Sequence, residues 1–138
     1  MSATSQPRRY SLARVACFPL DPMNGYISFG GRDKREYCFF PRPFGETLPS
    51  EPGVYAITRA SREDGAWHHE VLSVGCTENI AEVLKNHPCI ECLDAHGANT
   101  ICIRIEQSAP HCSSLACELI ESLSPPCQPT EDEVIERW

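Results

Sequence analysis

Nine cysteines occur in a chain of 138 residues, and two of them are spaced as zinc ligands are. Two residues separate Cys89 from Cys92, a spacing that lets both thiolates bind one zinc ion. With the nearby histidines and cysteines, the candidate zinc ligands are Cys89, Cys92, His96, His111, Cys112 and Cys117. A second well-spaced pair is missing, and in a reducing compartment cysteines serve as small buried hydrophobes. We therefore expect buried thiols and no cofactor, with a zinc site and a redox or disulfide role as the alternatives.

Two short segments carry a more specific pattern. They are Gly53-Val54-Tyr55, which follows Pro52, and Ser73-Val74-Gly75, with Asn79-Ile80 and His87 after it. On these residues the chain resembles the GIY-YIG nuclease family, which is named for its two tripeptides. The resemblance extends from about Pro52 to Gln128. It implies a small antiparallel sheet covered by helices, in the order β-β-α-β-α.

The resemblance also implies which residues would act. Family enzymes hydrolyse phosphodiesters with a tyrosine at the attacking water, an arginine that stabilises the phosphorane and a glutamate that holds Mg²⁺ or Mn²⁺. The corresponding positions here are Tyr55, Ser73, Val83, Ala116 and Gln128. Ser73 lacks a phenol and Val83 cannot stabilise negative charge, so only Tyr55 keeps the family's residue type. The resemblance thus implies a degenerate member that has lost its catalytic centre.

Glu118 is the nearest glutamate to the family's metal-binding position. The family spacing assigns that position to Ala116, on the buried stripe of a helix, and leaves Glu118 about 200° around it, facing solvent. The alternative is an active metal-dependent endonuclease with a rearranged site made of Tyr55, His69, Arg104 and Glu118. We expect His69 at the polar tip of a hairpin.

Hydrophobic periodicity predicts the elements that position these residues. Two runs of strand-forming residues indicate a hairpin with strands over 54–59 and 70–74 and a long polar tip over 61–68. A helix is predicted over 78–87, with Thr77 as its N-cap.

Further along, a half-buried strand is predicted over 100–106, with its isoleucines on one face. A last helix is predicted from Ser113 or Ser114 to about Leu123. These elements indicate an α+β fold, a small antiparallel sheet with helices packed on it.

The positions of turn-forming residues predict the domain organisation. We expect a flexible tail over 1–14, an N-terminal extension or hairpin over 15–50, a GIY-YIG-like domain over 51–130 and an acidic C-terminal tail over 131–138.

The charge of the chain is unevenly distributed. Residues 1–50 contain seven Lys and Arg against four Asp and Glu, a net +3, whereas residues 51–138 contain five against fifteen, a net −10. Because nuclease surfaces are usually basic, nucleic acid is an unfavoured partner and a protein is the expected one.

No apolar run approaches the roughly 18 residues of a membrane span, and the start lacks a secretory signal. We therefore expect no membrane partner and a cytoplasmic location, with a nuclear location still open.

The function predicted from the sequence is that of a catalytically degenerate GIY-YIG-like domain, which acts as a protein-binding or regulatory module. The alternatives are an active endonuclease that uses Mg²⁺ or Mn²⁺, and a zinc- or thiol-dependent domain.

Overall fold

A computed structural model describes residues 9–11, 27–31, 35–85 and 87–128. Most of the tail predicted over 1–14, and all of the acidic tail predicted over 131–138, lie outside these residues. In the described part, five strands are followed by a 3₁₀ turn, an α-helix, a sixth strand and a second α-helix, so the general α+β class is confirmed. The GIY-YIG order remains a prediction.

The strands form one antiparallel sheet. They are β1 (Arg9–Ser11), β2 (Ile27–Gly30), β3 (Glu36–Pro43), β4 (Gly53–Glu63), β5 (Ala66–Thr77) and β6 (Thr100–Ile105). Their order across the sheet is β1-β5-β4-β6-β3-β2. Strands β2 and β3 therefore belong to the same sheet as β4–β6, because β3 pairs directly with β6.

The hairpin of β4 and β5 is longer and tighter than predicted. Only Asp64 and Gly65 connect the strands, with φ angles of 52° and 79°, as a two-residue hairpin turn requires. Residues 61–63 and 66–68 continue the strand pairing up to this turn. The prediction of a long polar tip was wrong, because an Asp-Gly turn lets polar residues pair instead of looping out.

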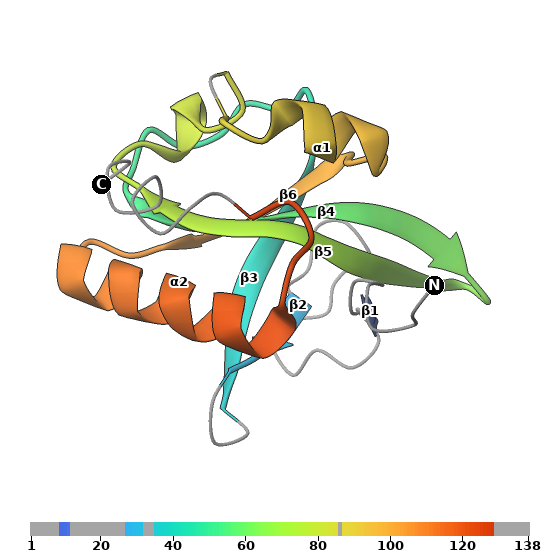
Figure 1. Ribbon diagram of the computed structural model, residues 1–138, viewed down its shortest axis with the longest axis horizontal. Helices are drawn as coiled ribbons and strands as arrows, with labels where there is room; N and C mark the ends of the chain where they lie inside the picture. The colour runs from blue at the N-terminus through green and yellow to red at the C-terminus, as the bar shows by residue number, and fades with distance from the viewer. Residues whose placement is uncertain (1–8, 12–26, 32–34, 86, 129–138) are drawn as a thin grey trace.

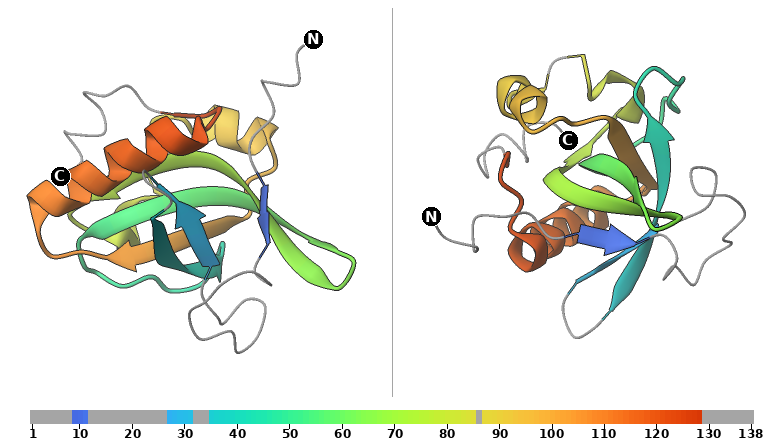
Figure 2. Two further views of the ribbon diagram at one scale, coloured as in Figure 1. Left: turned by 90° about the horizontal axis from the view of Figure 1, so that it is seen from below. Right: turned by 90° about the vertical axis from the view of Figure 1, so that its right-hand side faces the viewer.

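Helices cover both faces of the sheet. Helix α2 (Ala109–Leu123) packs against β4 and β5 on one face. The 3₁₀ turn η4 (Ile80–Glu82) and the short helix α1 (Ile90–Ala95) cover the other (Figure 1). Figure 2 shows α2 running beside the curled sheet, with β2 and β3 on its flank. The buried side chains accordingly form two hydrophobic cores, one on each face.

Strand β6 confirms the predicted alternation but not the half-buried character. Ile101 and Ile103 lie in the core beneath α1, and Cys102 lies in the core beneath α2. The two cores exclude solvent from both faces of β6 at these residues, although its sequence pattern predicts burial on one face only.

The predicted helix over 78–87 is the main error in secondary structure. Only η4 is helical there, and its N-cap is Asn79, whose side chain accepts a hydrogen bond from the backbone N–H of Ala81 at 3.1 Å. This short turn and the turns after it already bury Ile80 and Val83, so the apolar i, i+3 spacing did not require a full helix.

The last helix begins earlier than predicted. Ser108 is the N-cap of α2 and accepts from the backbone N–H of His111. Pro110 occupies the first helical turn, where its missing N–H costs nothing. Ser113 and Ser114 are interior helical residues, so neither is the cap. The C-terminal end at Leu123 agrees with the prediction.

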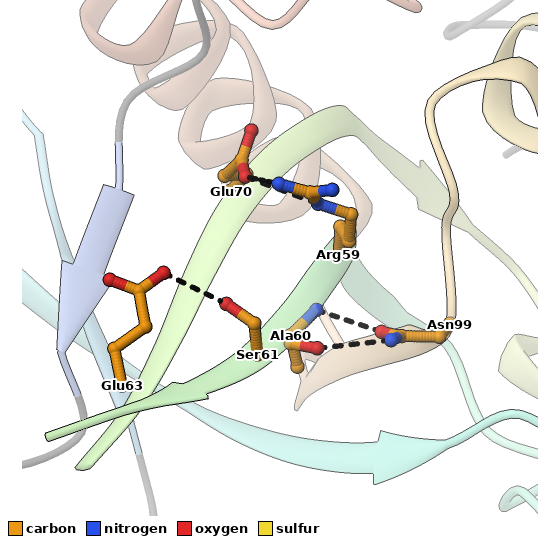
Figure 3. Close-up of polar contacts among 6 residues, drawn as sticks. All are labelled: Arg59, Ala60, Ser61, Glu63, Glu70 and Asn99. Carbon is orange, nitrogen blue, oxygen red and sulfur yellow. Dashed lines mark hydrogen bonds and ion pairs between the residues drawn. The ribbon is translucent and has the colours of Figure 1, made fainter. Parts of the chain in front are cut away.

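Polar contacts fix the start of β6 against β4 (Figure 3). The side-chain amide of Asn99 accepts from the N–H of Ala60 at 2.8 Å and donates to its carbonyl at 3.0 Å. The guanidinium of Arg59 forms an ion pair with Glu70 on the neighbouring strand. The Asn99 amide thus continues the pairing of β6 with β4 ahead of the first residue of β6, and the ion pair links β4 to β5.

Candidate functional site

Tyr55, the one catalytic position of the GIY-YIG resemblance that keeps its residue type, is completely enclosed. Its side chain has no exposed surface, and its hydroxyl lies 3.3 Å from His87 Nε2. The backbone N–H of Cys89 donates to His87 Nδ1 at 3.0 Å, so the ring proton of His87 is on Nε2 and is donated to Tyr55 Oη. Tyr55 therefore ties strand β4 to the segment before α1.

The other positions that the GIY-YIG resemblance assigns are buried or half-buried. Val83 is buried in the same core as Tyr55, and the buried hydroxyl of Ser73 has no hydrogen-bond partner among the described residues. Gln128 accepts from the N–H of Val74 and donates to its carbonyl. Its amide thus fastens the chain after α2 to the edge of β5.

Ala116 lies on the opposite face of the sheet from Tyr55. It belongs to the core between α2 and the sheet, whereas Tyr55 and Val83 belong to the core beneath α1. Its methyl group offers no ligand for a divalent metal, so the family's metal position does not fit Mg²⁺ or Mn²⁺ here.

His69 is buried rather than exposed at a hairpin tip, and the expectation of a polar tip position was wrong. The long β5 carries it inward, where Nδ1 lies 2.9 Å from Thr58 Oγ1 and 3.9 Å from Cys102 Sγ. Burial, and secondarily the charge of His68, lower the pKa of His69 to about 4. Burial raises the pKa of Cys102 to about 12. Both groups are neutral at pH 7, so this Cys–His contact does not produce a nucleophilic thiolate.

Arg104 and Glu118 line one polar pocket of about 200 Å³, beside Tyr37, Glu106 and His111. The Tyr37 hydroxyl donates to the Glu118 carboxylate, with distances of 3.2 and 3.3 Å to its two oxygens. The Arg104 guanidinium lies 5.7 Å from the centroid of the Tyr37 ring, and its Nη1 donates to the carbonyl of Cys38 at 3.2 Å.

The position of Glu118 corrects the sequence-based prediction. Its side chain is buried, with 7% of the residue exposed, because the strand pair β2–β3 covers a second flank of α2. A Cβ atom at Gly31 would lie within contact distance of the Glu118 carboxylate, so the glycine leaves room for it. Arg104 and Glu118 therefore line the same pocket, but Tyr55 lies on the other face of the sheet, and the four residues of the rearranged site do not converge.

One cluster of potential metal ligands is found among the described residues: Cys92, His96 and Cys127. Cys92 and Cys127 form a disulfide, and His96 Nδ1 lies 3.7 Å from Cys92 Sγ and 3.5 Å from Cys127 Sγ. Of the six predicted zinc ligands, only Cys92 and His96 are brought together. Cys127 was missed, because 35 positions separate it from Cys92 and no local spacing links them.

The remaining predicted zinc ligands are dispersed. Cys89 precedes α1 outside the cluster, His111 lines the polar pocket, and Cys117 is exposed on α2. Cys112 is buried against Cys76, and a hydrogen bond between the two thiols lowers the pKa of Cys76 to about 7 and raises that of Cys112. Because both side chains are fully enclosed, this pair is a feature of the core.

An apolar groove of about 450 Å³ runs along β3 and β6. Its walls include Phe40, Leu48, Ile103 and Ile105, and its rim carries Arg42 and Glu51. Ile105 is 40% exposed. The Arg42 guanidinium lies 3.7 Å from the centroid of the Phe40 ring, which fixes one wall of the groove.

The comparisons with known proteins identify no relative: no family model, no curated protein and no solved structure matches this chain. Within the described residues, no helix is long and apolar enough to cross a membrane.

Proposed function

We propose that this chain is a binding module without nuclease chemistry, and that its partner is a protein. The observation that carries the proposal is the complete burial of Tyr55. A phenol that activates water for attack on a phosphodiester must contact that water and the phosphate. Tyr55 instead accepts a hydrogen bond from a buried histidine and serves as a packing residue.

The positions of Val83 and Ala116 support the same proposal. The nuclease reaction needs an arginine and a glutamate to meet one phosphate. Here the corresponding residues are aliphatic and lie in different cores, on opposite faces of the sheet. Restoring both side chains would therefore not rebuild a catalytic centre.

The groove along β3 and β6 is the surface that we assign to the partner. Its volume falls within the range of about 300–1,000 Å³ that is typical of ligand pockets, and its walls are mostly aliphatic and aromatic. It suits one or two large apolar side chains of a peptide segment. The net charge of −10 over residues 51–138 makes a nucleic acid a poor alternative, since phosphate would be repelled.

The first test is a cleavage assay. Purified protein is incubated with labelled single- and double-stranded DNA and RNA in the presence of Mg²⁺ or Mn²⁺. We expect no cleavage. Cleavage that Tyr55→Phe abolishes would overturn the proposal.

The second test is selection of peptides from a displayed random library, followed by affinity measurements on those selected. We expect peptides with a large apolar residue, whose binding Ile105→Glu weakens by at least about tenfold, or about 1.4 kcal/mol. Ile90→Glu is the matched control, because Ile90 is 42% exposed and does not line the groove. Equal losses in the two variants, or a failure to select any peptide, would count against the groove.

A further inference from the structure

We propose that reduction of the Cys92–Cys127 disulfide creates a zinc site whose protein ligands are the two thiolates and the imidazole of His96. The inference is independent of the groove and of the nuclease question. It rests on the one cluster of sulfur and nitrogen donors found in the described part of the chain.

The distances in the cluster already suit a zinc ion. With Zn–S bonds of about 2.3 Å and Zn–N bonds of about 2.0–2.1 Å, a tetrahedral ion places its sulfur and nitrogen ligands about 3.6 Å apart. His96 Nδ1 lies 3.5 Å from Cys127 Sγ and 3.7 Å from Cys92 Sγ. The two sulfurs, which are bonded to each other, must separate to about 3.8 Å in such a site. Reduction is therefore the main change that the cluster needs.

The scaffold holds the three ligands independently of the disulfide. Cys92 and His96 are four residues apart at the end of α1, so they lie on one side of the helix. Cys127 is fixed by its own N–H, which donates to the carbonyl of Leu72 at 2.8 Å. The amide of Gln128 fastens the next residue to Val74. The ligands thus remain together when the sulfur–sulfur bond is broken.

Exposure of His96 leaves the site open on one side. Three protein ligands leave one tetrahedral position for a water molecule, as in zinc sites with an open position. Cys89 lies three residues before Cys92 but outside the cluster, so it is not among the ligands that we assign.

The chemistry needs an external two-electron reductant, either a thiol or a phosphine; a phosphine takes an oxygen atom from water and becomes the phosphine oxide, and the two protons of that water go to the two sulfurs. Two thiols of the reductant, or one dithiol, deliver two electrons and two protons, so Cys92 and Cys127 become thiols and the reductant becomes a disulfide. Zinc then binds the two sulfurs and displaces their two protons. His96 Nδ1 now lies 2.9 Å from the carbonyl oxygen of Cys92 and donates its proton to it. Zinc binding through Nδ1 moves that proton to Nε2, which changes the tautomer but not the charge.

The disulfide form excludes the metal, because a sulfur bonded to another sulfur is not a thiolate ligand. Zinc occupancy would therefore report the redox state of the surroundings. A small disulfide that oxidises the two bound thiolates would accept two electrons and leave as two thiolates, so the Cys92–Cys127 bond would re-form and the ion would be released.

The experiment compares the full chain before and after reduction by a phosphine, with Zn²⁺ titrated against a chromophoric chelator. We expect about one tightly bound zinc in the reduced protein and none in the oxidised protein. Co²⁺ in place of Zn²⁺ should give a sulfur-to-cobalt charge-transfer band. Metal should also protect Cys92 and Cys127 from alkylation, as mapped by mass spectrometry, and this measurement needs no variant.

Variants identify the ligands. Cys127→Ser should abolish tight binding, and His96→Ala should weaken it by at least about tenfold, since even indirect supports of metal ligands contribute that much. Cys117→Ser, which removes an exposed thiol on α2, should bind as the wild type does. Zinc binding that survives Cys127→Ser but is lost in Cys89→Ser would overturn the proposal, as would a reduced wild-type chain that binds no zinc.

Discussion

The ring of Tyr55 lies directly over Gly75 on the neighbouring strand. The two residues are paired across β4 and β5, and a Cβ atom at Gly75 would stand only 2.5 Å from the Tyr55 hydroxyl oxygen. This contact gives the two tripeptides a structural meaning, because the tyrosine of the first requires the glycine of the second. Close packing of Tyr55 on Gly75 therefore explains the presence of both residues without any catalytic role.

The first prediction is that Gly75→Ala destabilises the fold. The added methyl group must displace an enclosed aromatic ring, and overpacking of this kind costs about 1–3 kcal/mol. The free energy of unfolding, measured in urea, should fall by that amount. Gly30→Ala is the control, because a Cβ atom there meets nothing closer than 4.0 Å; a similar loss in both variants would contradict the explanation.

The second prediction concerns the hydrogen bond between Tyr55 and His87. Tyr55→Phe removes the hydroxyl that accepts from His87 Nε2, and losing one partner of a buried hydrogen bond costs about 1–3 kcal/mol. Combining it with His87→Leu removes the donor as well, so the double variant should lose less than the sum of the single variants. Urea unfolding of the four proteins measures this coupling. Additive losses would show that the bond does not contribute.

The fold was predictable where local chemistry and tertiary packing agree. The alternating β6 and the C-terminal end of α2 follow directly from their residue patterns. The helix predicted over 78–87 was wrong, because a 3₁₀ turn and the loop after it bury the same apolar side chains. The long tip predicted for the hairpin was wrong because polar residues also occur in paired strands, and Asp64-Gly65 alone suffices for the turn.

The candidate sites were less predictable, because they depend on contacts between distant segments. The i, i+4 spacing of Cys92 and His96 is a signal that sequence reasoning can use. Cys127 has no such relation to either residue and joins them only because the chain after α2 returns to β5. Glu118 was assigned to solvent from helical phase alone, which does not reveal that β2 and β3 cover that flank.

The third prediction tests the buried position of Glu118. Glu118→Ala leaves the half-buried Tyr37 hydroxyl without this acceptor and opens space beside Gly31, so a loss of about 1–3 kcal/mol is expected. Glu121→Ala, at an exposed position one turn along the same helix, should change the free energy of unfolding by less than about 0.5 kcal/mol. Equal effects in the two variants would mean that Glu118 contributes no more than a surface glutamate.

The fourth prediction is a loss of stability in mild acid that depends on His69. Its pKa falls from 6.5 to about 4 on folding, so below pH 6.5 the unfolded chain binds a proton that the folded chain does not. Stability is therefore complete above about pH 6.5 and is lost as the pH falls toward 4. Between about pH 7.5 and about pH 5 the loss from this residue should be about 2 kcal/mol.

Urea unfolding of the wild type and of His69→Gln across this pH range measures the effect. The variant lacks the titrating ring, so its stability should fall less steeply with pH, even if it is less stable at neutral pH. His68→Gln is the matched control, since His68 is only half-buried and adds the smaller effect on the pKa of His69. Because the slope of stability against pH counts protons taken up on unfolding, it separates titration of His69 from a simple packing loss. Parallel slopes for the wild type and His69→Gln would show that His69 is not the group that titrates.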